Sequence, residues 1–503
     1  MLPQQQDADV RHILLDTAAG TVRGVRVGNV ERFFGIPYAA APIGALRFAE
    51  PQRVEPWEGE RDASARGATA PQRHNAFPAL DVEPLIGTDQ DGGEDYLTLN
   101  IWRPAGGGAG LPVMVWIHGG GFVLGSKDAA ICDGSAFARD GVICIAINYR
   151  LGIEGFLPVP GVPTNLGLRD QIVALEWVRD NAEALGGDPG NVTVFGESAG
   201  AMALANLLTS PLAKGLFRRA IVQSGHGAMT REIPVAQRLV RKVARLLGIK
   251  PDADGFRTIR IDRALESQQK VSLPTTRIDL RDAAGREPVF GISRFVPVHG
   301  DDVLPKQPLE ALKGGAGQDV DLLIGTNAEE MNLYLVPTGV REKVGRLLAT
   351  YLLHRSQPQA RKVLAAYGMG QSGRRPGYAL TDAMNDLVFR WPARRFAEEH
   401  RGRTHMYEFE WRSPALDGQL GACHGMELPF VFDTLASVTG ERGLAGTAPP
   451  QELADRVHKI WVEFAKTGAL PWPEFDRTTR QVYQLAKGEA VHEPPMPAAP
   501  FLP

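Results

Sequence analysis

Residues 192–201 read "VTVFGESAGA", and this stretch decides the fold. A β-branched run passes into a Gly-Glu-Ser-Ala-Gly pentad, and small helix-favouring residues follow it. A serine on a sharp turn between a strand and a helix is the pattern of a nucleophile elbow. Gly196 and Gly200 remove side chains that would collide there, and the helix N-terminus favours negative charge near Ser198. The context favours Ser198 as a nucleophile over an ordinary turn serine, although Gly-x-Ser-x-Gly alone is a weak signal.

Apolar runs of parallel-strand length surround this turn, and a segment with helical spacing lies between two of them. Residues 165–187 carry Ile172, Leu175 and Val178 at that spacing and end in a glycine pair. Residues 14–39 alternate polar and apolar side chains between glycine-containing turns, which predicts antiparallel strands. Strands that alternate with helices predict an α/β fold, a mostly parallel twisted sheet with helices on both faces. The apolar runs are "PVMVWIHG" (112–119), "GVICIAINYR" (141–150), "NVTVFG" (191–196), "RAIVQSG" (219–225) and "VDLLIGTN" (320–327).

The organisation of the chain predicts one domain over residues 1–503. The segments at about 226–320 and 335–420 read as helical and loop insertions around the sheet. The glycine-rich residues 105–110 are too few for a domain linker and predict a surface turn.

The composition excludes several classes of partner. The chain has 44% hydrophobic and 22% charged residues, which is ordinary for a soluble protein, and its net charge of −3 argues against a nucleic-acid-binding surface. The first twenty residues do not resemble a secretory signal, and the longest apolar runs, such as 142–147, are too short to span a membrane. Three scattered cysteines suit neither a disulfide framework nor a zinc module. We therefore expect a cytoplasmic protein without nucleic-acid or membrane partners.

A second glycine-rich turn suits the oxyanion that a serine nucleophile generates. Residues 116–122, "WIHGGGF", place three glycines directly after an apolar run. The backbone N–H groups of Gly120 and Gly121, with that of Ala199, would form an oxyanion hole. A phosphate-binding loop is the alternative, but Ser126 stands where such a loop needs its lysine, so we reject nucleotide binding.

At this point the sequence resembles the type-B carboxylesterase family of α/β-hydrolases, over nearly the whole chain. The resemblance implies an α/β-hydrolase fold, no cofactor or metal, and a serine carboxylesterase that works through an acyl-enzyme intermediate. The stretches that carry it include "FFGIPYAAAPIGALRF" (33–48), "EDYLTLNIW" (94–102), "HGGGF" (118–122), "NYRLGIEGFL" (148–157), "NLGLRDQIVALEWV" (165–178) and "LFRRAIVQSG" (216–225).

The resemblance also implies an acid and a base that follow the serine. The segment 323–334, "LIGTNAEEMNLY", maps the acid to Glu330, but nothing local distinguishes it from Glu329 on physical grounds. The segment 421–432, "GACHGMELPFVF", maps the base to His424. Relatives further imply that Ser224 hydrogen-bonds the acid, whereas an ordinary strand-end serine is the other interpretation. Glu197 is a family hallmark and does not indicate a cationic substrate.

Other histidines and several departures from the family pattern bear on these assignments. His118 belongs to the oxyanion loop by the resemblance, and His299 stands where relatives often carry aspartate, so it is interpreted as structural. Tyr96 replaces a cysteine that forms a disulfide in secreted relatives, which agrees with a cytoplasmic location. Met331 replaces a common glycine and leaves the loop shape open.

The expected substrates are small-molecule esters. Aryl and alkyl carboxylic esters are the default, and xenobiotic esters fall within the same range. A carbamate or amide hydrolase of the same family is the first alternative. A non-catalytic, esterase-like binding protein is less consistent with the presence of Ser198, Glu330 and His424. A metal hydrolase lacks the expected His-Glu-x-x-His ligands.

Overall fold

The computed structural model describes residues 11–73, 79–87, 93–273, 275–288 and 293–502. Residues 1–10, on which the expectation of no secretory signal partly rests, lie outside the described residues. So do residues 274 and 289–292 of the first predicted insertion. No helix in the described ranges is long and apolar enough to cross a membrane.

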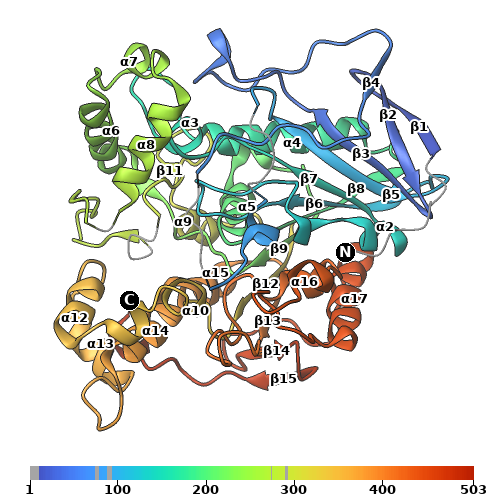
Figure 1. Ribbon diagram of the computed structural model, residues 1–503. Helices are drawn as coiled ribbons and strands as arrows, with labels where there is room; N and C mark the ends of the chain where they lie inside the picture. The colour runs from blue at the N-terminus through green and yellow to red at the C-terminus, as the bar shows by residue number, and fades with distance from the viewer. Residues whose placement is uncertain (1–10, 74–78, 88–92, 274, 289–292, 503) are drawn as a thin grey trace.

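A single large sheet organises the fold (Figure 1). Its order is β1-β2-β3-β5-β7-β6-β8-β9-β12-β13-β14-β15, with β4 beside β2, and β7 through β14 in this order run parallel to one another. The antiparallel strands predicted in 14–39 form one edge of it. The strands are β1 (Arg11–Thr17), β2 (Gly20–Val27), β3 (Val30–Pro37), β4 (Glu60–Asp62), β5 (Thr98–Pro104), β6 (Leu111–Ile117), β7 (Ile143–Ile147), β8 (Gly187–Glu197), β9 (Arg219–Gln223), β12 (Asp321–Asn327), β13 (Thr404–Phe409), β14 (Gln481–Gln484) and β15 (Glu489–His492).

Helices cover both faces of the sheet, which explains the continuous apolar runs of its central strands. Along β6, Val113 and Val115 pack in the same core as α4 and α5, whereas Met114 and Trp116 pack in the core on the other face with α2 and α17. The predicted α/β-hydrolase architecture is therefore confirmed. The helices are α1 (Glu83–Ile86), α2 (Ser135–Arg139), α3 (Gly152–Phe156), α4 (Leu166–Asn181), α5 (Ala199–Thr209), α6 (Ile233–Leu247), α7 (Ala253–Arg257), α8 (Ile261–Ser272), α9 (Pro308–Lys313), α10 (Asn332–Leu335), α11 (Val340–Lys343), α12 (Arg346–His354), α13 (Ala360–Ala366), α14 (Pro376–Asn385), a π-helical turn (Asp386–Arg390), α15 (Trp391–Glu399), α16 (Leu428–Val431) and α17 (Gln451–Thr467).

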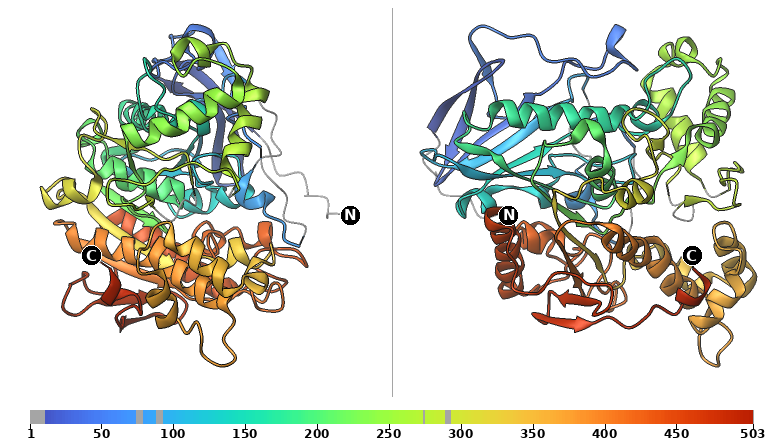
Figure 2. Two further views of the ribbon diagram at one scale, coloured as in Figure 1. Left: turned by 90° about the vertical axis from the view of Figure 1, so that its left-hand side faces the viewer. Right: turned by 180° about the vertical axis from the view of Figure 1, so that it is seen from behind.

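The two predicted insertions lie beside the carboxyl ends of the parallel strands (Figures 1 and 2). The first contains α6, α7 and α8 and a short parallel pair, β10 (Arg231–Glu232) and β11 (Val298–His299). The second contains α12, α13 and α14, which share a small apolar core of their own. Its predicted end at about residue 420 is too late, because β13 is a strand of the central sheet. This short strand is hard to recognise in the sequence, because polar residues precede and interrupt its buried apolar residues Met406, Tyr407 and Phe409.

Candidate active site

Ser198 stands on the turn between β8 and α5, with φ 53° and ψ −123°. Its backbone N–H donates to the carbonyl of Gln223 on the neighbouring strand β9 at 2.9 Å. A Cβ at Gly200 would collide with the carbonyl of Ile117, so only glycine lets α5 approach β6 this closely. The turn is therefore built as the sequence predicts, and it holds the serine side chain at the wall of a cavity of about 290 Å³.

His424 and Glu330 form a closely hydrogen-bonded pair beside this cavity. His424 Nδ1 lies 2.6 Å from Glu330 Oε2, and the carboxyl is completely buried. The other oxygen of Glu330 accepts the backbone N–H of Asn327, at the end of β12, at 2.7 Å. These two contacts fix the carboxylate, and the carboxylate in turn fixes the imidazole with its Nδ1–H donated to Glu330.

The neighbouring carboxylate, Glu329, has different partners. It accepts the backbone N–H of Ala422 at 3.0 Å and forms an ion pair with Arg412, whose side chain is more than half exposed. Glu329 thus turns toward solvent while Glu330 turns toward His424. The geometry separates the two acids that the sequence leaves equivalent.

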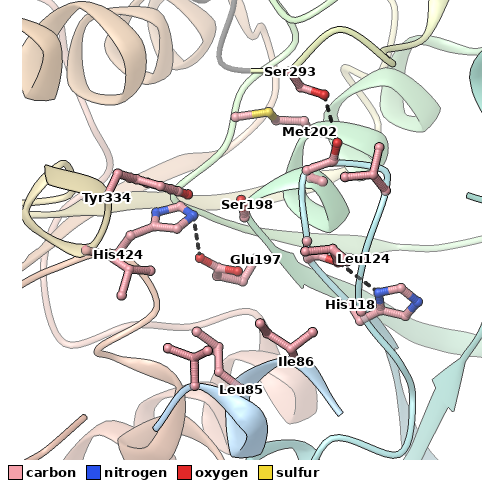
Figure 3. A pocket seen from close by; sticks show the side chains of 18 of the residues that line it. Leu85, Ile86, His118, Leu124, Glu197, Ser198, Met202, Ser293, Tyr334 and His424 are labelled. Atoms are coloured by element: carbon pink, nitrogen blue, oxygen red, sulfur yellow. Dashed lines mark hydrogen bonds and ion pairs between the residues drawn. The ribbon is translucent and has the colours of Figure 1, made fainter. Parts of the chain in front are cut away.

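The second ring nitrogen of His424 faces Glu197 and the cavity (Figure 3). Nε2 lies 3.0 Å from Glu197 Oε1, although the contact lacks the direction of a hydrogen bond. No hydrogen bond joins His424 to Ser198 within the described ranges. The phenol of Tyr334 lies near the Ser198 hydroxyl instead, and the Tyr334 ring lies against the imidazole with 5.5 Å between ring centres.

Three buried carboxyl groups surround the imidazole and set its charge. Burial opposes protonation of His424, but Glu197, Glu330 and Glu427 together outweigh it and raise the pKa of the ring to about 9. Burial, with the charges of Glu427 and Glu330, raises the pKa of Glu197 to about 8 against the opposing effect of His424. The cluster therefore favours an imidazolium at this position.

The glycine-rich turn after β6 lies next to the serine. Gly120 has φ 105° and Gly121 has φ 63°, a region of backbone conformation that glycine adopts most easily. A Cβ at Gly120 would collide with the carbonyl of Leu124, whereas one at Gly121 would meet open space. The backbone N–H groups of Gly120, Gly121 and Ala199 donate no hydrogen bond to any described residue, so all three are free for a ligand.

The remaining predicted residues lie in other surroundings. His118 is buried, its Nδ1 lies 2.9 Å from the carbonyl of Gly119, and burial lowers its pKa to about 4. His299 lines a separate cavity and contacts Thr230. The predicted hydrogen bond from Ser224 to the acid is wrong: Ser224 Oγ has no partner among the described residues. The hydrogen bonds that Glu330 does form are with Asn327 and His424.

Sequence reasoning missed much of the cavity wall. Tyr334 and Phe389 contact His424, and Met202, Met229 and Arg294 line the cavity further along. Met229, Arg294 and Phe389 belong to the insertions, where no motif marks them, whereas Tyr334 ends the quoted segment 323–334, in which the sequence singles out only the acids. In the residues that the structure describes, no cluster of three or more histidine, cysteine or acidic side chains suits a metal ion.

The chain is similar to known proteins over nearly its whole length. Residues 11–496 match the carboxylesterase family. The chain is 36% identical to para-nitrobenzyl esterase of Bacillus subtilis (strain 168), over 94% of this chain and 95% of that one. It is 33% identical to phenmedipham hydrolase of Pseudarthrobacter oxydans, over 91% of this chain and 92% of that one. A solved structure of PNB esterase superposes with a TM-score of 0.81 at 33% identity, covering 96% of this chain and 97% of the other.

Proposed function

This chain belongs to the carboxylesterase family and hydrolyses carboxylic esters, and we propose that Ser198, His424 and Glu330 carry out the reaction. The observation that supports the proposal most directly is the placement of His424. Its Nδ1 is held by a buried carboxylate, while its Nε2 faces the cavity that Ser198 lines. This arrangement is what a general base needs.

The proposed reaction begins with attack of Ser198 Oγ on the ester carbonyl carbon. His424 Nε2 takes the hydroxyl proton, and Glu330 stabilises the imidazolium that forms. The N–H groups of Gly120, Gly121 and Ala199 stabilise the oxyanion. The imidazolium then returns its proton to the leaving alcohol, an acyl-enzyme remains, and water cleaves it by the same sequence. Hydrogen bonds of this kind are often loose without substrate, so the Ser198–His424 bond is expected to form in the complex.

The cavity supports small apolar esters as substrates. Its lining is mainly apolar, with Leu85, Ile86, Val123, Met202 and Met229 among the residues that contribute. We propose aryl and alkyl carboxylic esters, including xenobiotic ones. A panel of para-nitrophenyl esters with increasing acyl length measures how much apolar chain the cavity accepts.

The cellular setting proposed for this reaction is the cytoplasm, with no nucleic-acid or membrane partner. Support comes from Cys132, Cys144 and Cys423, which are all free and buried. Disulfides are rare in cytosolic proteins, so unpaired cysteines agree with a reducing compartment.

A serine-directed reagent tests the proposed nucleophile. A fluorophosphonate should inactivate the enzyme and add one label, which mass spectrometry locates on Ser198. A chelator should leave the activity unchanged. A label on Ser224 or Ser126 with loss of activity would overturn the assignment.

A further inference from the structure

One cationic side chain lines the far part of the otherwise mainly apolar cavity. Arg294 is 5% exposed and shares the wall with Met202, Met229 and Ser293. Its segment is fixed beside the oxyanion loop, because Ser293 Oγ donates to the carbonyl of Gly121 at 2.8 Å (Figure 3). Arg294 therefore lines the cavity in a segment that is attached to the oxyanion loop.

Arg294 has no carboxylate partner among the described residues. Nη2 donates to the carbonyls of Leu273 and Thr276 at 3.3 and 2.9 Å, and Nη1 has no hydrogen-bond partner in the same set. A buried guanidinium normally has an anionic partner, because burial of an unpaired charge is costly.

The acid whose charge acts on Arg294 is already engaged elsewhere. Glu287 is buried and binds Arg355 at 2.8 Å and Arg231 at 3.4 Å. Two guanidinium groups thus pair with Glu287, and Arg294 is under the influence of its charge without forming an ion pair with it. Burial lowers the pKa of Arg294, as expected for a cation without its own counter-ion.

We propose that Arg294 binds a carboxylate carried by the acyl part of the substrate, so that half-esters of dicarboxylic acids are preferred. This inference rests on the proposed function of Ser198. The guanidinium fork matches a carboxylate in shape and charge, and Nη1 offers a donor that no described residue uses. Ser293 ties this segment to Gly121 in the oxyanion loop, and the placement on the acyl side is the part of the proposal that an acid on the alcohol side tests below.

Matched pairs of esters test the proposal. The mono-para-nitrophenyl esters of adipate, suberate and sebacate carry a terminal carboxylate, and the hexanoate, octanoate and decanoate esters are their neutral partners. Arg294→Met should lower kcat/KM for the best anionic ester by about tenfold to a hundredfold, the usual effect of losing a hydrogen bond to a charged group. The neutral ester of the same length should change little. Arg294→Lys should lie between the two, because it keeps the charge and loses the fork.

Three comparisons make the result decisive. Arg286→Met removes an exposed arginine that lines the separate cavity and should affect neither ester. In the unsubstituted protein, octanoate should inhibit more strongly than octanamide. This measurement does not depend on whether a variant folds. Equal loss on both esters after Arg294→Met, or equal inhibition by the acid and the amide, would overturn the proposal. A response confined to 4-acetyloxybenzoate relative to phenyl acetate would overturn the acyl-side placement. Failure of the proposed function is distinct, since both esters would then be hydrolysed without Ser198.

Discussion

Two charged clusters near the catalytic cavity, an acidic end and a cationic end, carry opposite charge imbalances. At one end Glu197, Glu330 and Glu427 surround the single imidazole of His424. At the other end Arg231, Arg294 and Arg355 surround the single carboxylate of Glu287; Arg294 lines the catalytic cavity, whereas Arg231 and Glu287 line the separate cavity beside it. The two clusters differ in the source of the charge that balances each of them. The acidic end suits a positive charge that develops on His424 during the reaction, whereas the cationic end suits a negative charge that enters with a ligand.

Among the variants that test this comparison, removal of the nucleophile should cause the largest loss of kcat. Ser198→Ala should lower kcat by about 10⁶, as loss of a member of a catalytic triad does, while circular dichroism shows an intact fold. The loss should be equal for anionic and neutral esters, because the acidic end performs the chemistry of both. Ester hydrolysis that persists near the native rate would remove the acidic end from the mechanism.

The adjacent acids of the acidic end give the next effect. Glu330→Gln should cost up to about 10⁴ in kcat, since the amide cannot stabilise the imidazolium as the buried carboxylate does. Glu329→Gln is the matched control and should be only mildly impaired, because Glu329 binds Arg412 and the backbone instead. Steady-state kinetics of both variants with one neutral ester decide the matter, and the reverse order would move the acid by one residue.

The oxyanion loop lies between the two ends and should respond more moderately. Gly120→Ala should cost about 10²–10³ in kcat, the usual result of losing one oxyanion donor, because its Cβ collides with Leu124. Gly121→Ala should cost less, since a Cβ there meets open space, although its φ of 63° disfavours a side chain. A near-native kcat for Gly120→Ala would contradict the proposed role of its N–H group.

The smallest expected effect is a shift in pH dependence. The general base must be neutral, and the carboxylates raise the pKa of His424 to about 9, so activity should fall on acidification at a higher pH than an isolated histidine would give. Glu197→Gln removes one negative charge and lowers the pKa of His424. The acidic midpoint of kcat/KM should then move down by about one to three pH units. The acidic midpoint of kcat/KM for Glu329→Gln should equal that of the unsubstituted enzyme. An upward shift, or none, in Glu197→Gln would contradict the electrostatic explanation.

The acidic end was largely predictable from the sequence and the cationic end was not. The turn at Ser198 and the glycine run after β6 are contiguous motifs in which local steric demands fix the residue types. The α/β fold was predicted from apolar runs that alternate with helical spacing, and the family and the esterase activity from the resemblance; all three are confirmed. The proposed roles of Ser198, Glu330 and His424 stay predictions.

Tertiary contacts account for what the sequence could not supply. Glu329 and Glu330 differ only through the partners that the fold brings to each. Arg294 reaches the cavity from a segment without a motif, and Tyr334 ends the quoted segment 323–334 without being marked as a lining residue by it. The hydrogen bond predicted for Ser224 is absent among the described residues, and the bonds that Glu330 does form are with Asn327 and His424.

The backbone of Ser198 has a consequence for laboratory evolution. Its φ of 53° with ψ of −123° is a conformation that costs a non-glycine residue about 1–3 kcal/mol. Glycine adopts it freely, so Ser198→Gly should melt at a higher temperature than the active enzyme. A library screened for heat resistance alone would therefore enrich chains that have lost the nucleophile, and selection for thermostability has to be coupled to turnover at every round.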